Sequence, residues 1–465
     1  MSLPCPPLAL VTSRFTGSLV GALMGDCHGA PFEFAGRPNV KVVAQHLLRY
    51  RRERGVSDGW TDDTAEDAAV SALSFTDDTA MTRSVAASLI GRRGYDAVDM
   101  AKRFAGEYQK EPLRGYGYNV TTVFDAIASE KYDEDIYRPA ADQFGGSGSY
   151  GNGGAMRIAP VALFQFSRLL KRVKSIKESG DGAVAATLSS ATLLSLPPLE
   201  SVLADLPDDI CVHSTKLTHS NSLGFHGALL QCVAVKLALR DGLSSSKTAK
   251  QLDAGQYLDG LTRAMRNVEE GQDEGRRKKA KVVAEDKDEE SDDNSDDDSD
   301  DYYENGDDPG SLPYVEKLAL IGELLRQVGT PPSSKPNRIG TSDPFRLKPV
   351  VKRLGNSVAA HGSVPTAIYC FLRAAVEDDD TKRPPAPKLA ENDANSVLNH
   401  FLGFDRAILY AICCGGDTDT IASMTGAIAG AYWGVEAVDA ALSASCEGLE
   451  DARDFARLLA AFSAD

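Results

Sequence analysis

Apolar residues along this chain recur at helical spacing, and runs that alternate apolar and polar residues are scarce. After Thr79, for example, Met81, Val85 and Leu89 repeat every four positions, and Gly91 closes the run. Such a repeat places the side chains on one face of a helix. The sequence therefore predicts an all-α protein. The predicted helices cover 14–25, 79–91, 98–108, 224–240, 314–328, 365–376, 421–433 and 451–462.

The first predicted helix carries a stripe of glycines. Gly17, Gly21 and Gly25 are four residues apart, so they share one helix face and allow another backbone to come close. We expect this helix to end at Asp26.

Two acidic clusters stand directly before predicted helices. One is Thr76-Asp77-Asp78-Thr79 and the other is Asp417-Thr418-Asp419-Thr420. Each cluster alone is better explained as a helix cap, since Asp and Thr favour the first turn. Together they are the oxygen-rich set that Mg²⁺ prefers, and without a cation so many carboxylates would repel one another. Metal-assisted chemistry is therefore the leading hypothesis.

The residues 61–64 repeat the letters of the first cluster, Thr-Asp-Asp-Thr, and are a rival metal site. Only the second copy opens a full amphipathic helix, so we prefer Thr76 to Thr79 and expect the first copy to be loop.

The charge of the chain is concentrated in one segment. The net charge is −17 over 465 residues, and residues 285–308 hold fifteen Asp or Glu and one Lys. The remainder is nearly neutral and offers no basic face for direct binding of nucleic acid. A basic run over 276–281 precedes the acidic tract. We predict a disordered insertion over 276–308, set within one catalytic domain made of 1–275 and 309–465.

The eight cysteines show neither CxxC spacing nor a disulfide framework, which indicates a reducing compartment. We find no uninterrupted apolar stretch of membrane-spanning length and no basic segment before Leu8 to Val11. We expect a soluble intracellular monomer that does not bind membranes.

The motifs together resemble a known family. Gly25-Asp26 with Glu33, the segment GSYGNGGAMR at 148–157, Thr218-His219 and GGDTDT at 415–420 resemble the ADP-ribosylhydrolase family, relatives of dinitrogenase-reductase-activating glycohydrolase. Longer stretches such as SFTDDTAMTRS and LTHSNSLGFHGALLQ look most like the subtype that removes ADP-ribose from serine and trims poly(ADP-ribose). The resemblance implies a compact, orthogonal multi-helix fold with two Mg²⁺ ions in a central cleft.

The resemblance also assigns roles to residues. It implies Glu33 as the proton-transferring carboxylate, with Asp417 and Asp419 orienting water and metal. The implied metal ligands are Thr76, Asp77, Asp78, Asp417, Asp419 and Thr420. The implied substrate-binding residues are Asp26, Gly115, Phe144, Gly148, Ser149, Tyr150, Gly151, Asn152 and His219.

Several of these residues have a simpler interpretation. Asp26 could be a helix-end hydrogen bonder, and His219 a capped residue at a helix start. Phe144 and Tyr150, which the resemblance places on the adenine and the ribose, could instead be core. The glycine-rich segment at 148–154 suits a pyrophosphate cradle on its own chemistry, because small residues let backbone N–H groups approach an anion.

The resemblance implies Mg²⁺-dependent hydrolysis of the C1″–O bond of ADP-ribose on serine, and of poly(ADP-ribose) and O-acetyl-ADP-ribose. The alternatives are an ADP-ribosylarginine hydrolase, a two-metal phosphatase and a non-enzymatic, crystallin-like relative. The expected partners are ADP-ribose and ADP-ribosylated proteins such as histones. The same resemblance suggests the nucleus and cytoplasm and the DNA damage response.

Overall fold

The computed structural model describes residues 6–34, 36–52, 72–132, 134–179, 210–244, 252–285, 311–328, 345–378 and 401–464. Within these ranges the regular elements are helices, and the β contacts are two isolated bridges, so the predicted all-α class is confirmed. In chain order the elements are α1 (Leu8–Gly29), η1 (Ala30–Phe32), α2 (Val40–Arg52), α3 (Asp77–Arg92), α4 (Ala97–Lys110), α5 (Tyr118–Ala128), α6 (Arg138–Ala141), η2 (Gln143–Gly146), α7 (Gly153–Met156), α8 (Ala159–Ser179), α11 (Ile210–Lys216), α12 (Ser222–Ser244), α13 (Ala254–Glu285), α14 (Pro313–Arg326), α15 (Lys348–Leu354), α16 (Ala360–Glu377), α18 (Gly403–Cys414), α19 (Thr418–Trp433), η5 (Val435–Ala437), α20 (Ala440–Ala444) and α21 (Leu449–Ala461).

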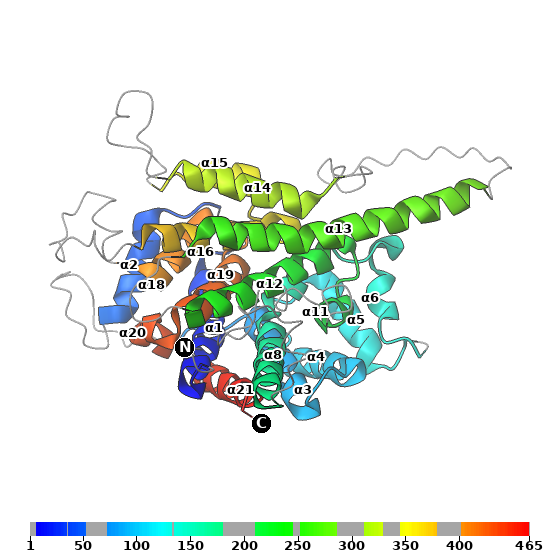
Figure 1. The fold of residues 1–465 in the computed structure, drawn as a ribbon, viewed down its shortest axis with the longest axis horizontal. Helices are drawn as coiled ribbons and strands as arrows, with labels where there is room; N and C mark the ends of the chain where they lie inside the picture. The colour runs from blue at the N-terminus through cyan, green and yellow to red at the C-terminus, as the bar shows by residue number, and fades with distance from the viewer. Residues whose placement is uncertain are drawn as a thin grey trace.

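Helices α1 and α19 form the centre of the molecule, where they lie side by side with their backbones in direct contact (Figure 1). A methyl group added to Gly21 would overlap the carbonyl oxygen of Gly426, and one added to Gly426 would overlap the carbonyl oxygen of Gly21. Gly17 and Gly430 stand in the same reciprocal relation. The close approach predicted from the glycine stripe is therefore confirmed, and its partner is the helix that follows the second acidic cluster.

The ends of two predicted helices were wrong. Helix α1 continues to Gly29, so Asp26 lies inside the helix and not at its end. Helix α16 begins at Ala360, five residues before Pro365, where we expected it to begin. Proline lacks a backbone N–H donor and therefore favours the first turn of a helix, but α16 continues across Pro365, whose side chain is buried.

Several helices were not predicted, and α18 shows why. Its side chains are buried on nearly every side, from Phe404 to Cys414. A helix buried all round has no polar face, so its sequence carries no amphipathic period.

Helix α13 extends beyond the body of the molecule (Figure 1). It runs to Glu285, so the stretch from Arg276, where we placed the start of the disordered insertion, is helical. Arg, Lys and Ala are strong helix formers, which explains why a basic low-complexity run continues a helix. The acidic residues 286–308 lie outside the described residues. The prediction of a single catalytic domain around them stays a prediction.

Two helical segments are long and apolar enough to cross a membrane by length and composition, Leu8–Phe32 and Ser222–Ser244. In the structure 67% and 89% of their apolar windows are buried inside the protein. Core helices of a large helical domain pass the same test, and α1 and α12 contact several other helices. The seven described cysteines are buried and form no disulfides with one another.

Candidate active site

The first acidic cluster begins helix α3. The Thr76 hydroxyl accepts a hydrogen bond of 3.3 Å from the backbone N–H of Asp78 and caps the helix. The Asp77 N–H donates to the carbonyl oxygen of Arg114 at 2.7 Å, in the loop that contains Gly115. A Cβ on Gly115, whose φ is +89°, would lie 3.7 Å from Asp77 Oδ1. The cap and the loop together hold both aspartates in the first turn.

Asp26 supports this cluster from helix α1. Its carboxylate accepts hydrogen bonds from the backbone N–H groups of Thr76 at 3.0 Å and Thr79 at 3.1 Å, and from the Thr79 hydroxyl at 2.5 Å. Asp26 is fully buried. The helix-end interpretation of Asp26 was therefore wrong, since the residue bonds to the first turn of α3, which contains Asp77.

The second acidic cluster begins helix α19. The Asp417 N–H donates to the carbonyl oxygen of Asn356 at 3.0 Å, and the Thr418 hydroxyl donates to that of Gly29 at 2.9 Å. Asp419 Oδ1 accepts from the backbone N–H of Thr420 at 2.8 Å. These bonds fix the turn against α1 and against the segment that precedes α16.

The fold brings the two clusters together. The Thr420 hydroxyl lies within hydrogen-bond distance of the Asp78 carboxylate. Oxygens of Glu33, Asp417 and Asp419 lie within 4.8 Å of one another, close enough to share a metal ion. Glu33 follows η1, and the next residue, Phe34, donates its N–H to the carbonyl oxygen of Gly416 at 3.1 Å. The backbone thus places Glu33 beside the second cluster.

The carboxylates of the site repel one another. Burial, and after it the charge of Asp419, raise the pKa of Asp77 to about 8. Burial and Asp419 likewise raise the pKa of Glu33 to about 7. The pKa values of Asp78 and Asp417 are raised well above their usual range by the same two causes. A divalent cation would relieve this repulsion.

The residues fit a hard cation. Among the described residues, Asp78 Oδ1 is buried without a hydrogen-bond partner, although a buried carboxylate oxygen normally has one. The surrounding donors are carboxylate and hydroxyl oxygens, which Mg²⁺ prefers over nitrogen or sulfur. The cluster can therefore hold a metal, with Glu33, Asp417 and Asp419 as its most compact group.

The glycine-rich segment borders the cluster. Asn152 Nδ2 donates to Asp417 Oδ2 at 2.6 Å and to the Ser363 hydroxyl at 3.0 Å. Gly148 has a φ of +71°, and a Cβ there would lie 2.8 Å from the backbone nitrogen of Asn221. Gly151 N–H donates to the Ser149 hydroxyl at 3.2 Å. The predicted cradle therefore touches the predicted metal site directly.

Two aromatic rings stand at this segment. The ring centroids of Phe144 and Tyr150 are 5.9 Å apart, with their planes tilted by 32°. Phe144 is 46% exposed and has a φ of +52°, an unusual backbone conformation for a bulky residue. An exposed ring held in such a conformation favours a binding surface over the core for Phe144.

His219 lies under the same segment and is buried. A Cβ added to Gly153 would lie 2.9 Å from His219 Nε2, and one added to Gly151 would lie 3.2 Å from it. Burial, and after it the nearby Arg157 charge, lower the pKa of His219 to about 3. His219 is therefore a neutral side chain that faces the glycines.

Several site residues were missed at the level of sequence. They are Thr79, which bonds to Asp26, Thr418, which bonds to Gly29, Asn356, which holds the Asp417 backbone, and Arg157. Thr79 and Thr418 stood inside the recognised clusters, and Arg157 closed the glycine-rich segment. The Asn356 contact comes through its backbone oxygen, which no side-chain pattern reveals. The repeat at 61–64 lies outside the described residues.

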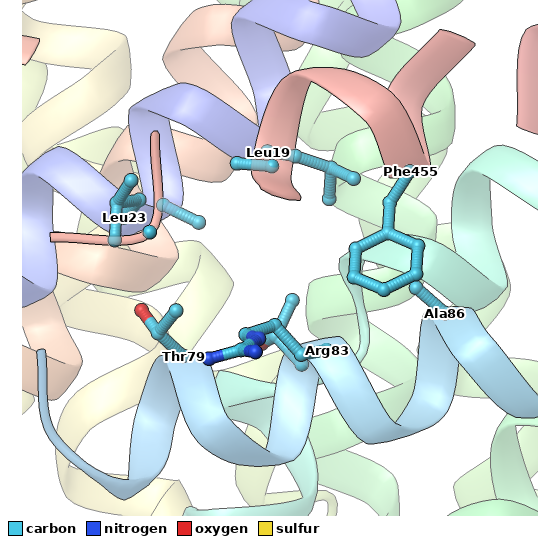
Figure 2. Close-up of a pocket in the computed structure, with 10 residues that line it drawn as sticks. Leu19, Leu23, Thr79, Arg83, Ala86 and Phe455 are labelled. Carbon is cyan, nitrogen blue, oxygen red and sulfur yellow. The ribbon is translucent and has the colours of Figure 1, made fainter. Parts of the chain in front are cut away.

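A small pocket lies on another side of α3, between α1 and α21 (Figure 2). Its lining includes Leu19, Leu23, Ala86 and Phe455, and its polar side chains are those of Thr79, Thr82 and Arg83. It has no carboxylate in its lining, so it lacks the groups that the chemistry of the acidic clusters needs.

Comparison with known proteins shows which family has a sequence similar to that of this chain. The family model for ADP-ribosylglycohydrolase matches residues 7–195 and 168–465. The chain is 36% identical over 439 residues to the mouse protein "ADP-ribosylhydrolase ARH3", covering 94% of this chain and 89% of that one. The human protein of the same name is 34% identical, covering 94% and 90%. The chicken protein of that name is 36% identical over 448 residues, covering 96% and 92%. The chain therefore belongs to the ADP-ribosylglycohydrolase family of glycosidase-type hydrolases.

Proposed function

We propose that this protein hydrolyses the C1″–O bond that links ADP-ribose to serine on proteins, and the corresponding bonds of poly(ADP-ribose) and O-acetyl-ADP-ribose. The observation that carries the proposal is the 2.6 Å hydrogen bond from Asn152 to Asp417. It joins a glycine segment suited to a diphosphate to a carboxylate cluster suited to a metal. The similar proteins named ADP-ribosylhydrolase support the same substrate class.

The glycine segment and the two aromatic rings bind the ADP end of the substrate. Phe144 offers an exposed ring face to the adenine, and Tyr150 lies next to it over the ribose. The small residues between Gly148 and Gly153 let the diphosphate approach the backbone closely. Because Asn152 bonds to Asp417, a substrate held here extends its second ribose toward the acidic clusters.

The acidic clusters form the reaction centre. Two Mg²⁺ ions bound here would supply binding of the ribose hydroxyls and a lower pKa for the attacking water. The residues that would hold them are Thr76, Asp77, Asp78, Asp417, Asp419 and Thr420. Glu33 has the role of proton carrier. Its carboxyl is half-buried and its pKa is raised to about 7, so it can accept and release a proton near neutral pH. Asp417 and Asp419 orient the water at C1″, where an oxocarbenium-like state develops.

Product release from defined substrates tests the proposal. Serine-, arginine- and O-acetyl-linked ADP-ribose would each be incubated with the protein, with Mg²⁺ or with excess chelator. We expect free ADP-ribose from the serine and O-acetyl substrates only when Mg²⁺ is present. Cleavage of the arginine linkage alone would identify an ADP-ribosylarginine hydrolase, and no cleavage of any substrate would favour a non-enzymatic relative.

We further propose a monomer that acts in the nucleus and cytoplasm on ADP-ribosylated proteins, histones among them, without binding nucleic acid directly. The near-neutral charge outside 285–308 supports the last point. Sedimentation of the purified protein and retention on DNA at low salt would test these two properties.

A further inference from the structure

Arg157 is a buried cation without a carboxylate partner. It is 2% exposed, and among the described residues it forms no ion pair. Its guanidinium stacks 4.5 Å from the centre of the Phe104 ring and donates to the Thr218 hydroxyl at 2.6 Å and to the carbonyl oxygen of Ser214 at 3.4 Å. Burying an unpaired guanidinium is costly, so this placement calls for a functional reason.

Thr218 joins Arg157 to His219. Its hydroxyl oxygen lies 2.7 Å from His219 Nδ1 and is completely buried. A guanidinium can only donate hydrogen bonds, so the Thr218 hydroxyl oxygen is the acceptor in its bond with Arg157. A threonine hydroxyl has one hydrogen, and among the described residues its remaining partner is His219 Nδ1. If Nδ1 carried the proton instead, the Thr218 hydrogen would stay buried without an acceptor, which is unfavourable.

This arrangement fixes the protonation of the imidazole. Nδ1 accepts from Thr218, so the proton of the neutral ring resides on Nε2. Nε2 is the nitrogen that faces Gly151 and Gly153. Gln143 secures the same unit by donating to the Thr218 carbonyl oxygen at 2.8 Å, and its neighbour in the chain is Phe144.

We propose that Arg157 and Thr218 are positioning residues that hold His219 in its Nε2–H form, as a hydrogen-bond donor to an acceptor oxygen of the ligand bound over the glycine segment. The identity of that ligand as ADP-ribose rests on the proposed function. We call the chain of contacts from Arg157 through Thr218 to His219 the relay. Because His219 in this form can donate but not accept at Nε2, the relay favours a ligand with a hydrogen-bond acceptor at this position over one with a donor.

The test begins with the ligand-free protein. Nitrogen-15 NMR of the labelled imidazoles distinguishes the two neutral tautomers. We expect the His219 signals of the unchanged protein to show Nδ1 as acceptor and Nε2 as protonated. Thr218→Val should give a mixture of tautomers, whereas Thr218→Ser keeps the hydroxyl and should retain the original spectrum. Arg157→Met, if it folds, should resemble Thr218→Val. A protonated Nδ1 in the unchanged protein would overturn the proposal.

Ligand binding gives the second readout. Thr218→Val should weaken ADP-ribose binding about tenfold, the value of one well-placed hydrogen bond, and Thr218→Ser should restore it. In a His219→Ala background Thr218→Val should have no further effect, since the relay then has no end point. Thr215→Val is the matched control, because it removes another buried hydroxyl, bonded to Cys211 O at 2.8 Å, outside the relay. Additive losses in the double variant would reject the relay.

The two proposals fail in different ways. If the unchanged protein does not bind ADP-ribose, the proposed function is wrong, and the NMR spectra still decide how His219 is protonated. If ADP-ribose binds tightly and Thr218→Val binds it equally well, the function stands and the relay is rejected.

Discussion

The Thr420 hydroxyl donates a hydrogen bond of 3.1 Å to Oδ2 of Asp78, a residue 342 positions earlier in the chain. This bond joins the first turns of α3 and α19, so the two acidic clusters form one site. Each turn also brings the positive end of a helix dipole to the carboxylates. That partial charge is too small to balance several buried carboxylates, which is why a divalent cation is expected there.

The first prediction concerns these carboxylates. Asp419→Ala, or Asp77→Ala combined with Asp78→Ala, should abolish turnover and remove the stabilisation that Mg²⁺ gives against thermal unfolding. A ligand present at a hundredfold excess over its Kd stabilises the native state by about 2.7 kcal/mol, so the loss is measurable by differential scanning fluorimetry. Full activity of the unchanged protein in excess chelator would contradict this prediction.

The repeat at 61–64 supplies the control. Asp62→Ala combined with Asp63→Ala removes the same letters from the rival copy and should leave turnover and the Mg²⁺ effect nearly intact. If this variant loses activity as Asp77→Ala with Asp78→Ala does, the metal site was assigned to the wrong copy.

The second prediction concerns Glu33. Glu33→Gln should still bind ADP-ribose but should not hydrolyse the substrate, because the amide keeps the shape of the side chain and cannot transfer the proton. Isothermal calorimetry would measure binding, and product release would measure turnover. A rate close to that of the unchanged protein would assign proton transfer to another residue.

The sequence predicted the parts of the site that depend on side-chain chemistry. Asp77, Asp419 and the glycine segment could be named as candidates because the chemistry of carboxylates, threonines and glycines can be read from residue type alone. Asn356 was missed because it acts through its backbone oxygen, and Asp26 was misplaced because a glycine-rich pattern does not mark where a buried helix ends. Such contacts arise from the packing of distant segments, which single-sequence periodicity does not record.

The third prediction concerns the contact between α1 and α19. Gly21→Ala would force a methyl group against the carbonyl of Gly426 and should destabilise the protein by about 1–3 kcal/mol or more. It should also lower activity, since α1 carries Asp26 and α19 carries Asp419. Gly106→Ala is the control, because nothing lies within 4 Å of a Cβ at that helical position. It should leave activity unchanged and stabilise the protein by up to about 1 kcal/mol. Urea unfolding would measure both.

The fourth prediction concerns Glu269, whose carboxylate caps α14 by accepting from the N–H groups of Tyr314 at 3.0 Å and Val315 at 3.3 Å. Burial raises the pKa of Glu269 from 4.5 to about 7. Between these values the folded state holds the proton more tightly than the unfolded state, so this group's contribution to stability falls as pH rises. In the Glu269→Gln variant the side chain is an amide, which does not ionise over this pH range. Relative to this variant, the unchanged protein should lose stability between pH 5 and pH 8 in urea unfolding, and a constant difference would contradict the assignment.

The last prediction concerns the acidic tract. A variant that lacks residues 286–308 tests the role of this tract. The deletion starts after Glu285 because α13 is helical up to that residue. A polyanion tethered to the enzyme would raise the local concentration of basic substrates by long-range attraction, an effect that salt screens. Deletion should therefore leave kcat and KM on O-acetyl-ADP-ribose unchanged and should raise KM on an ADP-ribosylated histone peptide. The difference in KM should shrink as the salt concentration rises, whereas the loss of a packed contact would persist.

A control that replaces the tract with a neutral Gly/Ser segment of equal length separates charge from length. Equal KM values on the peptide at low salt would show that the tract is only a solvated linker.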